Sequence, residues 1–216
     1  MSAPQAVLFD CDGVLVDSEG ITSGIIAENL TSHGFPIHSA DVHKLFVGGT
    51  MAGVQALVQS RGVVLPDGWR DDINAEIAKV LAVRVEAMPG VPELLDLLDA
   101  RGILYAVVSN GPMAKMRATL GRTGLWDRLE GRIISAHDIG VAKPDPGPYL
   151  HAAAGLKLTA ADCVVVEDSV NGLRAGVAAG MVSYGITSDL SGDDIRALGA
   201  IPFNSMSDLP KLLEII

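Results

Sequence analysis

Several kinds of residue are scarce in this chain of 216 residues, and each scarcity excludes a class of protein. No apolar run approaches the roughly 20 residues that a membrane-spanning helix needs. No cluster of lysine and arginine occurs, and 16 basic against 26 acidic residues leave a net charge of -10. Binding to a nucleic-acid backbone normally requires such a basic cluster. We therefore expect neither a membrane nor a nucleic acid as a partner.

Cysteine is also rare, and the start of the chain lacks basic residues. Cys11 and Cys163 both fall in or beside expected buried strands, which favours reduced thiols in the cytoplasm. The segment 1–5 places no basic residue ahead of a short apolar stretch, so we expect no signal peptide. Aromatic residues make up 4% of the chain and apolar residues 49%. A core of aliphatic side chains is expected, in one large domain or two modest ones.

Short apolar runs alternate with helical patterns over most of the chain. The runs that predict strands are Ala6–Phe9, Leu104–Val108, Arg132–Ile134, Cys163–Val166 and Met181–Tyr184. Helical spacing of apolar residues follows in 91–98, 113–120 and 170–177. Strand and helix in alternation predict an α/β fold, in which a parallel sheet carries helices on both faces.

Residues 20–85 differ, because no strand-like alternation occurs there. Apolar residues at helical spacing predict three helices, around 21–30, 54–58 and 73–81. We therefore expect an all-helical domain at 17–87, inserted into a core formed by 1–16 and 88–216.

Two carboxylates, Asp10 and Asp12, follow the first predicted strand. Side chains two positions apart project the same way from a strand, so both would face one site. One carboxylate can attack a phosphoryl group while the other transfers the proton. A calcium-binding loop is excluded by spacing, because Val14 and Ile21 occupy positions where that loop requires oxygen ligands.

Three further motifs also stand at predicted strand ends. These are Val108-Ser109-Asn110, Lys143-Pro144 and Glu167-Asp168-Ser169. Ligands of open parallel sheets bind beyond the carboxyl ends of the strands. The four motifs together therefore predict one phosphate-handling site.

In this order, the four motifs resemble those of the haloacid dehalogenase superfamily, and most closely its subfamily with a helical cap inserted after the first strand, which includes β-phosphoglucomutases and phosphatases. The resemblance covers essentially the whole chain. It implies a Rossmann-like core, a cap at 17–87 and phosphoryl transfer through an aspartyl-phosphate.

The resemblance also implies a role for each matching residue. Asp10 would be the nucleophile and a Mg²⁺ ligand, and Asp12 the general acid and base, with its backbone carbonyl on the metal. Ser109 would bind a phosphoryl oxygen and Lys143 would neutralise phosphoryl charge. The alternatives are a plain turn for Ser109 and a solvent-facing side chain for Lys143.

The last motif supplies the remaining metal ligands by the same resemblance. Asp168 would bind Mg²⁺ directly, whereas Glu167 would act through water or orient a neighbour. Adjacent residues on a strand point in opposite directions, so identical roles are not expected for the two. Ser169 and Asn171 would support the metal site or cap the following helix.

Several polar residues are candidates for contacts with the substrate. Lys115 would pair with a substrate carboxylate or phosphate, although an exposed helical lysine is an equal alternative. The full set of substrate-binding candidates is Glu19, Thr50, Asn110, Gly111 and Lys115.

Two departures from the β-phosphoglucomutase pattern favour hydrolysis. The cap stretch 48–52 lacks the arginine that grips a second phosphate, and the position of a mutase histidine is taken by Thr22 or its neighbours. We therefore predict a Mg²⁺-dependent phosphatase acting on a small, sugar-like phosphorylated metabolite, as a monomer or weak dimer. The alternatives are a phosphomutase and a non-catalytic binding protein on the same fold.

Overall fold

The computed structural model of this chain describes residues 3–46 and 51–216. The chain divides into two compact units. Unit 1 comprises Met1–Val16 and Glu86–Ile216, and unit 2 comprises Asp17–Val85. The expected domain limits, 16/17 and 87/88, lie within two residues of these boundaries. Thr50, one of the expected substrate contacts, lies outside the described residues.

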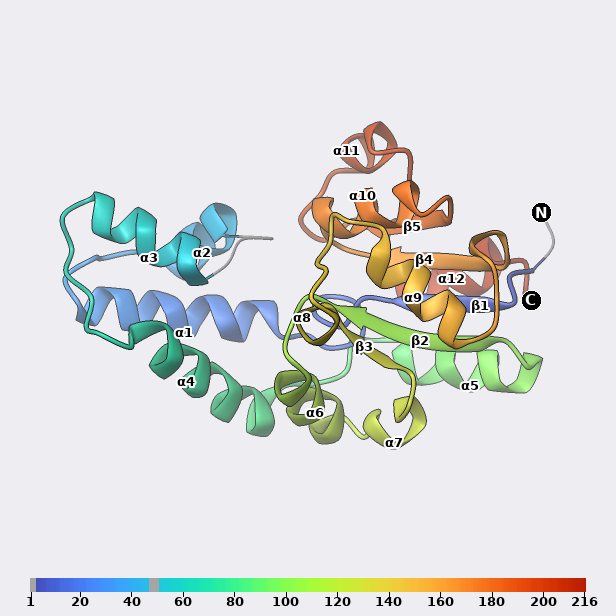
Figure 1. Cartoon of the computed structure of the whole chain (residues 1–216), viewed down its shortest axis with the longest axis horizontal. Coiled ribbons are helices and arrows are strands. Elements are labelled where there is room, and N and C mark those ends of the chain that lie inside the picture. The colour runs from blue at the N-terminus through green and yellow to red at the C-terminus, as the bar shows by residue number, and fades with distance from the viewer. Residues whose placement is uncertain (1–2, 47–50) are drawn as a thin grey trace. The chain divides into compact units, whose positions relative to one another are not determined.

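Unit 1 is built on a parallel sheet, as predicted (Figure 1). The described strands are β1 (Ala6–Phe9), β2 (Leu104–Ser109), β3 (Ile133–Ser135), β4 (Cys163–Glu167), β5 (Val182–Ile186) and β6 (Ile201–Phe203). Their spatial order is β3-β2-β1-β4-β5-β6. Strand β1 lies between β2 and β4, and Leu8 pairs with Ala106 on one side and with Val165 on the other. The carboxyl ends of β1, β2 and β4 therefore meet at one edge of the sheet.

Strand β6 was not assigned from the sequence, and its residues explain why. It has only 3 residues, and Pro202 stands at its centre. Proline cannot donate a hydrogen bond to a neighbouring strand and is tolerated mainly at sheet edges. The last place in the strand order is such an edge.

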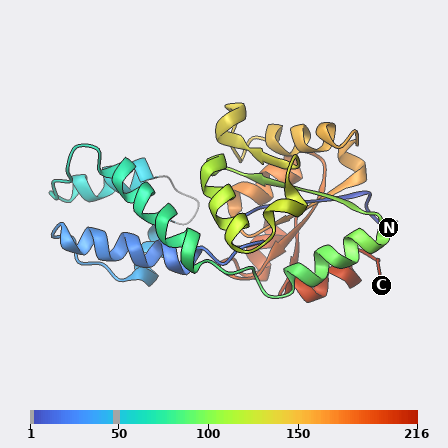
Figure 2. The ribbon, with the colours of Figure 1, turned by 90° about the horizontal axis from the view of Figure 1, so that it is seen from below.

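The helices of unit 1 cover both faces of the sheet. They are α5 (Val91–Arg101), α6 (Met113–Arg122), α7 (Trp126–Leu129), α8 (Ala136–Ile139), α9 (Gly147–Gly155), α10 (Val170–Ala178), α11 (Gly192–Ala197) and α12 (Leu209–Leu212), with 3-10 turns at Ala160–Asp162 and Met206–Asp208. Helices α9 and α10 pack on one face, where Leu8, Val108 and Val165 form a buried cluster with Tyr149 and Ala175. Helix α5 lies on the opposite side of the sheet from α9 (Figures 1 and 2).

Unit 2 is entirely helical in its described residues. Its helices are α1 (Glu19–Ser32), α2 (Ser39–Phe46), α3 (Met51–Ser60) and α4 (Trp69–Arg84). Helix α2 was not predicted from the apolar pattern. The indole Nε1 of Trp69 donates a hydrogen bond of 2.7 Å to Oδ1 of Asn29, which joins α4 to α1. Among the described residues, no helix combines the length and apolar character that a bilayer span would require.

Candidate active site

A tight loop after β1 presents the first two carboxylates. The amide of Asp10 donates to Val166 O at 2.9 Å, so the loop starts from the centre of the sheet. Gly13 has φ of 72°, a left-handed conformation that glycine adopts without strain. The amides of Leu15 and Val16 then bond to Cys11 O and close the loop. The sequence thus builds a short, self-bonded turn that fixes the backbone between the two aspartates.

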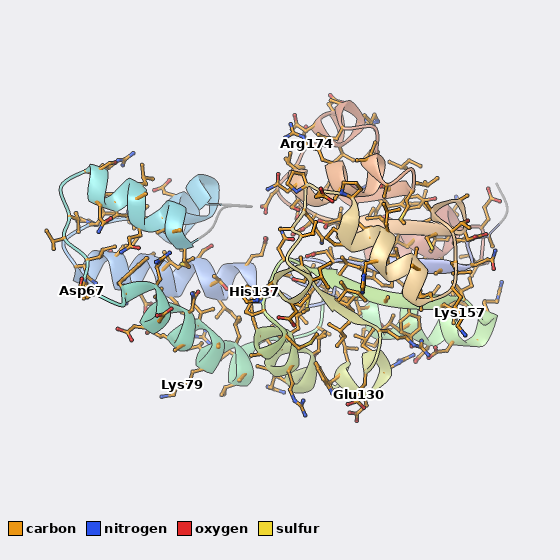
Figure 3. The ribbon with its side chains drawn as sticks, viewed as in Figure 1. Asp67, Lys79, Glu130, His137, Lys157 and Arg174 are labelled. Carbon is orange, nitrogen blue, oxygen red and sulfur yellow. The ribbon has the colours of Figure 1, made fainter. Side chains whose placement is uncertain are left out.

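The ammonium group of Lys143 joins the carboxylates of two strands. Its Nζ lies 2.5 Å from Asp10 Oδ1 and 2.6 Å from Glu167 Oε1. All three residues are buried, whereas Glu130, Lys157 and Arg174 lie on the outside of unit 1 (Figure 3). Buried charges are stable only when they are paired and hydrogen-bonded. The sequence left open that Lys143 faces solvent, and the structure excludes this alternative because the side chain is buried.

This pairing sets the protonation of the three groups. Burial raises the pKa of Asp10 to about 7. The charge of Lys143 lowers this pKa, but repulsion from the carboxylates of Glu167 and Asp12 raises it again. Burial alone would lower the pKa of Lys143, but Asp10 and Glu167 outweigh it and hold that pKa well above its usual range. Burial would raise the pKa of Glu167, yet Lys143 and hydrogen bonds leave it below its ordinary value. Lys143 is therefore a permanent cation beside the candidate nucleophile.

Glu167 accepts hydrogen bonds on both of its oxygens. Oε1 accepts from Lys143 Nζ and from the Tyr149 hydroxyl at 2.8 Å. Oε2 accepts from the amide of Asp168 at 3.1 Å and from the amide and hydroxyl of Ser169 at 3.2 and 3.0 Å. A carboxylate offers about four lone-pair positions, so these donors saturate it. The geometry favours an orienting role for Glu167 over direct ligation of a metal.

Gly172 leaves the room that the Glu167 carboxylate occupies. A Cβ atom at this position would lie 1.8 Å from the Glu167 carboxyl carbon. The amide of Gly172 donates a hydrogen bond of 3.1 Å to Ser169 Oγ, and Ser169 is the N-cap residue of α10. Ser169 thus caps the helix and contacts Glu167 at the same time, which joins the two roles that sequence left open.

The carboxylates of Glu167 and Asp168 converge, although adjacent residues within a strand point in opposite directions. One carboxylate oxygen each of Asp10, Glu167 and Asp168 lies within 4.8 Å of the others. Strand alternation does not govern this pair because β4 ends at Glu167, and Asp168 already belongs to the bend before α10. Alternation applies only while the backbone stays extended. Different roles for the two residues stay a prediction.

The converging acids fit a hard divalent cation. Three carboxylates carry more negative charge than the single ammonium of Lys143 balances, and carboxylate oxygens are the ligands that Mg²⁺ prefers. Among the described residues this is also where His, Cys, Asp and Glu side chains gather closely enough to hold an ion. No histidine takes part, and His137 lies on the outside of unit 1 (Figure 3).

Asn110 and Ser109 lie at the carboxyl end of β2, but their described bonds are within the protein. The Asn110 side chain accepts from the amide of Lys143 at 2.9 Å and donates to Lys143 O at 3.2 Å. Ser109 Oγ accepts from the amide of Gly111 at 3.0 Å, and Ser135 Oγ donates to Gly111 O at 2.9 Å. Asn110 therefore positions the Lys143 backbone. Substrate contacts of Asn110 and Gly111 stay predictions.

Lys115 and Asp12 form the second ion pair of the site. Lys115 Nζ lies 2.9 Å from Asp12 Oδ2, and both side chains are 25% exposed. Burial lowers the pKa of Lys115, but the Asp12 carboxylate outweighs it and leaves the pKa above its ordinary value. Lys115 is therefore not a fully exposed helical lysine, and its contact with a substrate stays a prediction.

Two residues of the site were missed by sequence analysis, Tyr149 and Ser135. Tyr149 lies on α9, six residues after Lys143, and is fully buried. The only available signal was its polar hydroxyl on a face of α9 that is otherwise small and apolar. Glu19 begins α1 in unit 2, and its proposed substrate contact stays a prediction.

The profile of the haloacid dehalogenase-like hydrolases matches residues 4–180. A curated relative, the 6-phosphogluconate phosphatase of Escherichia coli (strain K12), is 33% identical over 214 residues, which span 98% of this chain and 96% of that protein.

Solved structures show the same fold over the full length. A haloacid dehalogenase family hydrolase of Deinococcus radiodurans R1, crystallised with bound phosphate and sodium, is 31% identical with a TM-score of 0.85, over 100% of this chain and 97% of that chain. A putative β-phosphoglucomutase of Thermotoga maritima is 25% identical with a TM-score of 0.81, over 100% of both chains.

Proposed function

The chain belongs to the haloacid dehalogenase-like hydrolases, and on that basis we propose that it is a Mg²⁺-dependent phosphatase of a small, sugar-like phosphorylated metabolite. The observation that carries the proposal is the buried bridge from Lys143 to Asp10 and Glu167. A buried carboxylate beside a fixed cation, at the carboxyl edge of a parallel sheet, is suited to attack an anionic phosphoryl group. The name of the Escherichia coli relative supports a phosphorylated sugar derivative as substrate.

The first half of the reaction forms an acyl phosphate, the aspartyl-phosphate, on Asp10. The Asp10 carboxylate attacks phosphorus, and the bond from phosphorus to the ester oxygen breaks. Asp12 donates its proton to that oxygen, so the product leaves as an alcohol. Lys143 balances the negative charge that the phosphoryl oxygens bring to Asp10, and Ser109 stands at the end of β2 to hydrogen-bond one of them.

The second half returns Asp10 to its free carboxylate. A water molecule gives a proton to Asp12 while its oxygen bonds to phosphorus. The bond between phosphorus and the Asp10 oxygen then breaks, and inorganic phosphate leaves. Asp12 therefore regains the proton that it gave to the leaving group.

Magnesium, when bound, would neutralise phosphoryl charge and hold the transferred group in line with the nucleophile. We assign its ligands to the Asp10 and Asp168 carboxylates and to the backbone carbonyl of Asp12. This assignment is supported by the converging oxygens of Asp10, Glu167 and Asp168. Glu167, with both oxygens occupied by donors, keeps Lys143 and Asp168 in place.

Replacement of the nucleophile tests the proposal most directly. In Asp10→Asn, phosphate release from p-nitrophenyl phosphate and from a panel of phosphorylated metabolites should fall below detection, because an amide does not attack phosphorus. The matched control is Asp127→Asn, which changes an exposed aspartate on α7 and should leave turnover unchanged. Full activity in a folded Asp10→Asn protein would remove the assignment.

A phosphomutase is the second candidate, and the resemblance to the putative β-phosphoglucomutase of Thermotoga maritima supports it. The missing arginine in 48–52 argues for hydrolysis instead. Product analysis separates the two, because a phosphatase releases inorganic phosphate while a mutase yields an isomeric sugar phosphate and releases little.

Substrate choice is proposed to depend on the helical unit, Asp17–Val85. Glu19 and Thr50 are its candidate contacts. Glu19→Ala should change the ratio of kcat/KM between two sugar phosphates rather than lower both equally. We further propose that the enzyme is cytoplasmic and that it acts as a monomer or weak dimer. Size-exclusion chromatography with light scattering would measure its oligomeric state.

A further inference from the structure

The ion pair between Lys115 and Asp12 joins helix α6 to the loop after β1. The two residues are 103 positions apart in sequence, and Nζ lies 2.9 Å from Oδ2. Lys115 stands on the first turn of α6, directly after the turn at 110–112 that follows β2. The pair therefore connects the first turn of α6 to the loop after β1.

Local helix energetics do not explain a lysine at this position. The first turn of a helix carries the positive end of the helix dipole and favours acidic residues. Helix α6 has no acidic residue in its first turn and places Lys115 there. The carboxylate of Asp12 compensates for this unfavourable placement, so the position of the lysine is explained by the tertiary contact.

A second buried polar residue, Thr119, lies on the same helix face. It stands one turn after Lys115. Its hydroxyl bonds to Lys115 O at 3.2 Å. The Thr119 hydroxyl therefore supports the helix turn that carries Lys115, and Lys115 in turn pairs with Asp12.

We propose that Lys115 is a positioning residue that holds the Asp12 carboxyl group in the place from which it exchanges protons with the leaving group and with water. The proposal rests on the proposed function, because it assigns Lys115 to the proton-transfer part of that reaction. Lys115 neither binds the phosphoryl group, which is the task of Lys143, nor contacts the remainder of the substrate. It replaces the expectation from sequence that Lys115 binds a substrate carboxylate or phosphate.

The leaving group distinguishes these roles. An alcohol must receive a proton from Asp12 as the bond from phosphorus to oxygen breaks, whereas p-nitrophenolate is a weak base and departs without one. Because kcat/KM reports the steps up to departure of the leaving group, it isolates the donation of the proton by Asp12. Three substrates are needed: p-nitrophenyl phosphate, an uncharged polyol phosphate and a phosphorylated sugar acid.

The test compares Lys115→Met and Lys115→Arg with the wild type, and Lys211→Met, an exposed lysine on α12, is the matched control. In Lys115→Met, kcat/KM should fall at least about tenfold for both alkyl phosphates and less than about threefold for p-nitrophenyl phosphate. Lys115→Arg keeps a donor and a charge, so it should restore part of the loss. Lys211→Met should match the wild type on all three substrates.

Other outcomes overturn the proposal. An equal fall on all three substrates would assign Lys115 to the phosphoryl group or to general stability, which thermal unfolding of each variant would separate. A loss confined to KM for the sugar acid would make it a substrate contact, and no loss at all would make the ion pair incidental. Failure of the proposed function has its own signature, because wild type and Asp10→Asn would then release equal phosphate from every substrate.

Discussion

At the scale of the residue, Glu167 shows how one buried carboxylate can organise a site. Its oxygens receive donors from Lys143, Tyr149, Asp168 and Ser169, and these come from three separate segments of the chain. An isolated buried carboxylate would be costly, but one with charged and neutral donors on both oxygens is stabilised. Glu167 thereby fixes the ammonium group that the nucleophile needs.

Removal of one neutral donor tests this role. Tyr149→Phe deletes the bond of 2.8 Å to Glu167 Oε1 without changing the size of the ring. The free energy of unfolding should fall by about 1.5–3 kcal/mol, because a buried charged acceptor loses a partner. Phosphatase kcat should fall by roughly tenfold, since the partners that orient ligating groups commonly have effects of that size. Urea unfolding and steady-state kinetics measure the two quantities.

The matched control is Tyr184→Phe, which deletes a bond of 3.2 Å from the Tyr184 hydroxyl to Leu212 O. It should lower stability modestly and leave kcat unchanged. If the two variants lose the same fraction of kcat, Tyr149 has no special connection with the site.

At the scale of the element, helix α10 is held unusually close to the sheet. A Cβ atom at Gly176 would lie 2.5 Å from Ser183 Oγ and 3.1 Å from Val165 Cβ. The same helix carries Gly172 against Glu167. Two glycines one turn apart therefore bring the start of α10, with its N-cap Ser169, up to β4 and the acidic cluster.

An alanine at this contact should move the helix. Gly176→Ala should lower the free energy of unfolding by about 1–3 kcal/mol, because the added methyl group overpacks the contact with β4 and β5. Gly121→Ala on α6 is the control, since no atom lies within 4 Å of its added Cβ. It should stabilise the protein by up to about 1 kcal/mol through helix propensity. Chemical denaturation should therefore show changes in the free energy of unfolding of opposite sign for the two variants. An unchanged free energy of unfolding in Gly176→Ala would show that α10 can shift freely.

At the scale of the whole molecule, a net charge of -10 is compatible with a phosphorylated substrate because the local field of the site differs from the global one. Lys143 and Lys115 both stand among the acids at the carboxyl edge. The acids still exceed these cations, so a divalent cation would relieve their mutual repulsion in the folded state only.

Magnesium should therefore stabilise the fold as a whole. At a concentration one hundred times its Kd, the gain in free energy of unfolding is about 2.7 kcal/mol, provided the unfolded chain does not bind the ion. Thermal unfolding of protein stripped with EDTA, with and without MgCl₂, measures the gain as a rise in Tm. Without Mg²⁺, Asp168→Asn should have a Tm equal to or higher than that of the wild type. On addition of MgCl₂ it should show only a small part of the rise in Tm that the wild type shows. An equal rise in both proteins would place the ion elsewhere.

The apolar pattern of the sequence predicted the parallel sheet, since runs such as 105–108 and 163–166 are buried on both faces of it. Because parallel strands end at one edge, Asp10, Ser109 and Glu167 were bound to lie near one another. The hydrogen-bond and ion-pair partners of these side chains could not be predicted in this way, because no periodic pattern in the sequence specifies them. Three contacts arise only where loops and helices pack together: Lys115 with Asp12, Asn110 with the Lys143 backbone, and Tyr149 with Glu167.

The convergence of Glu167 and Asp168 has the same origin, because a strand's period ends where its backbone bends. Local sequence therefore determined which groups reach the edge of the sheet. Only the tertiary structure decided which charges meet there, because burial makes each unpaired charge costly and selects the partner within reach.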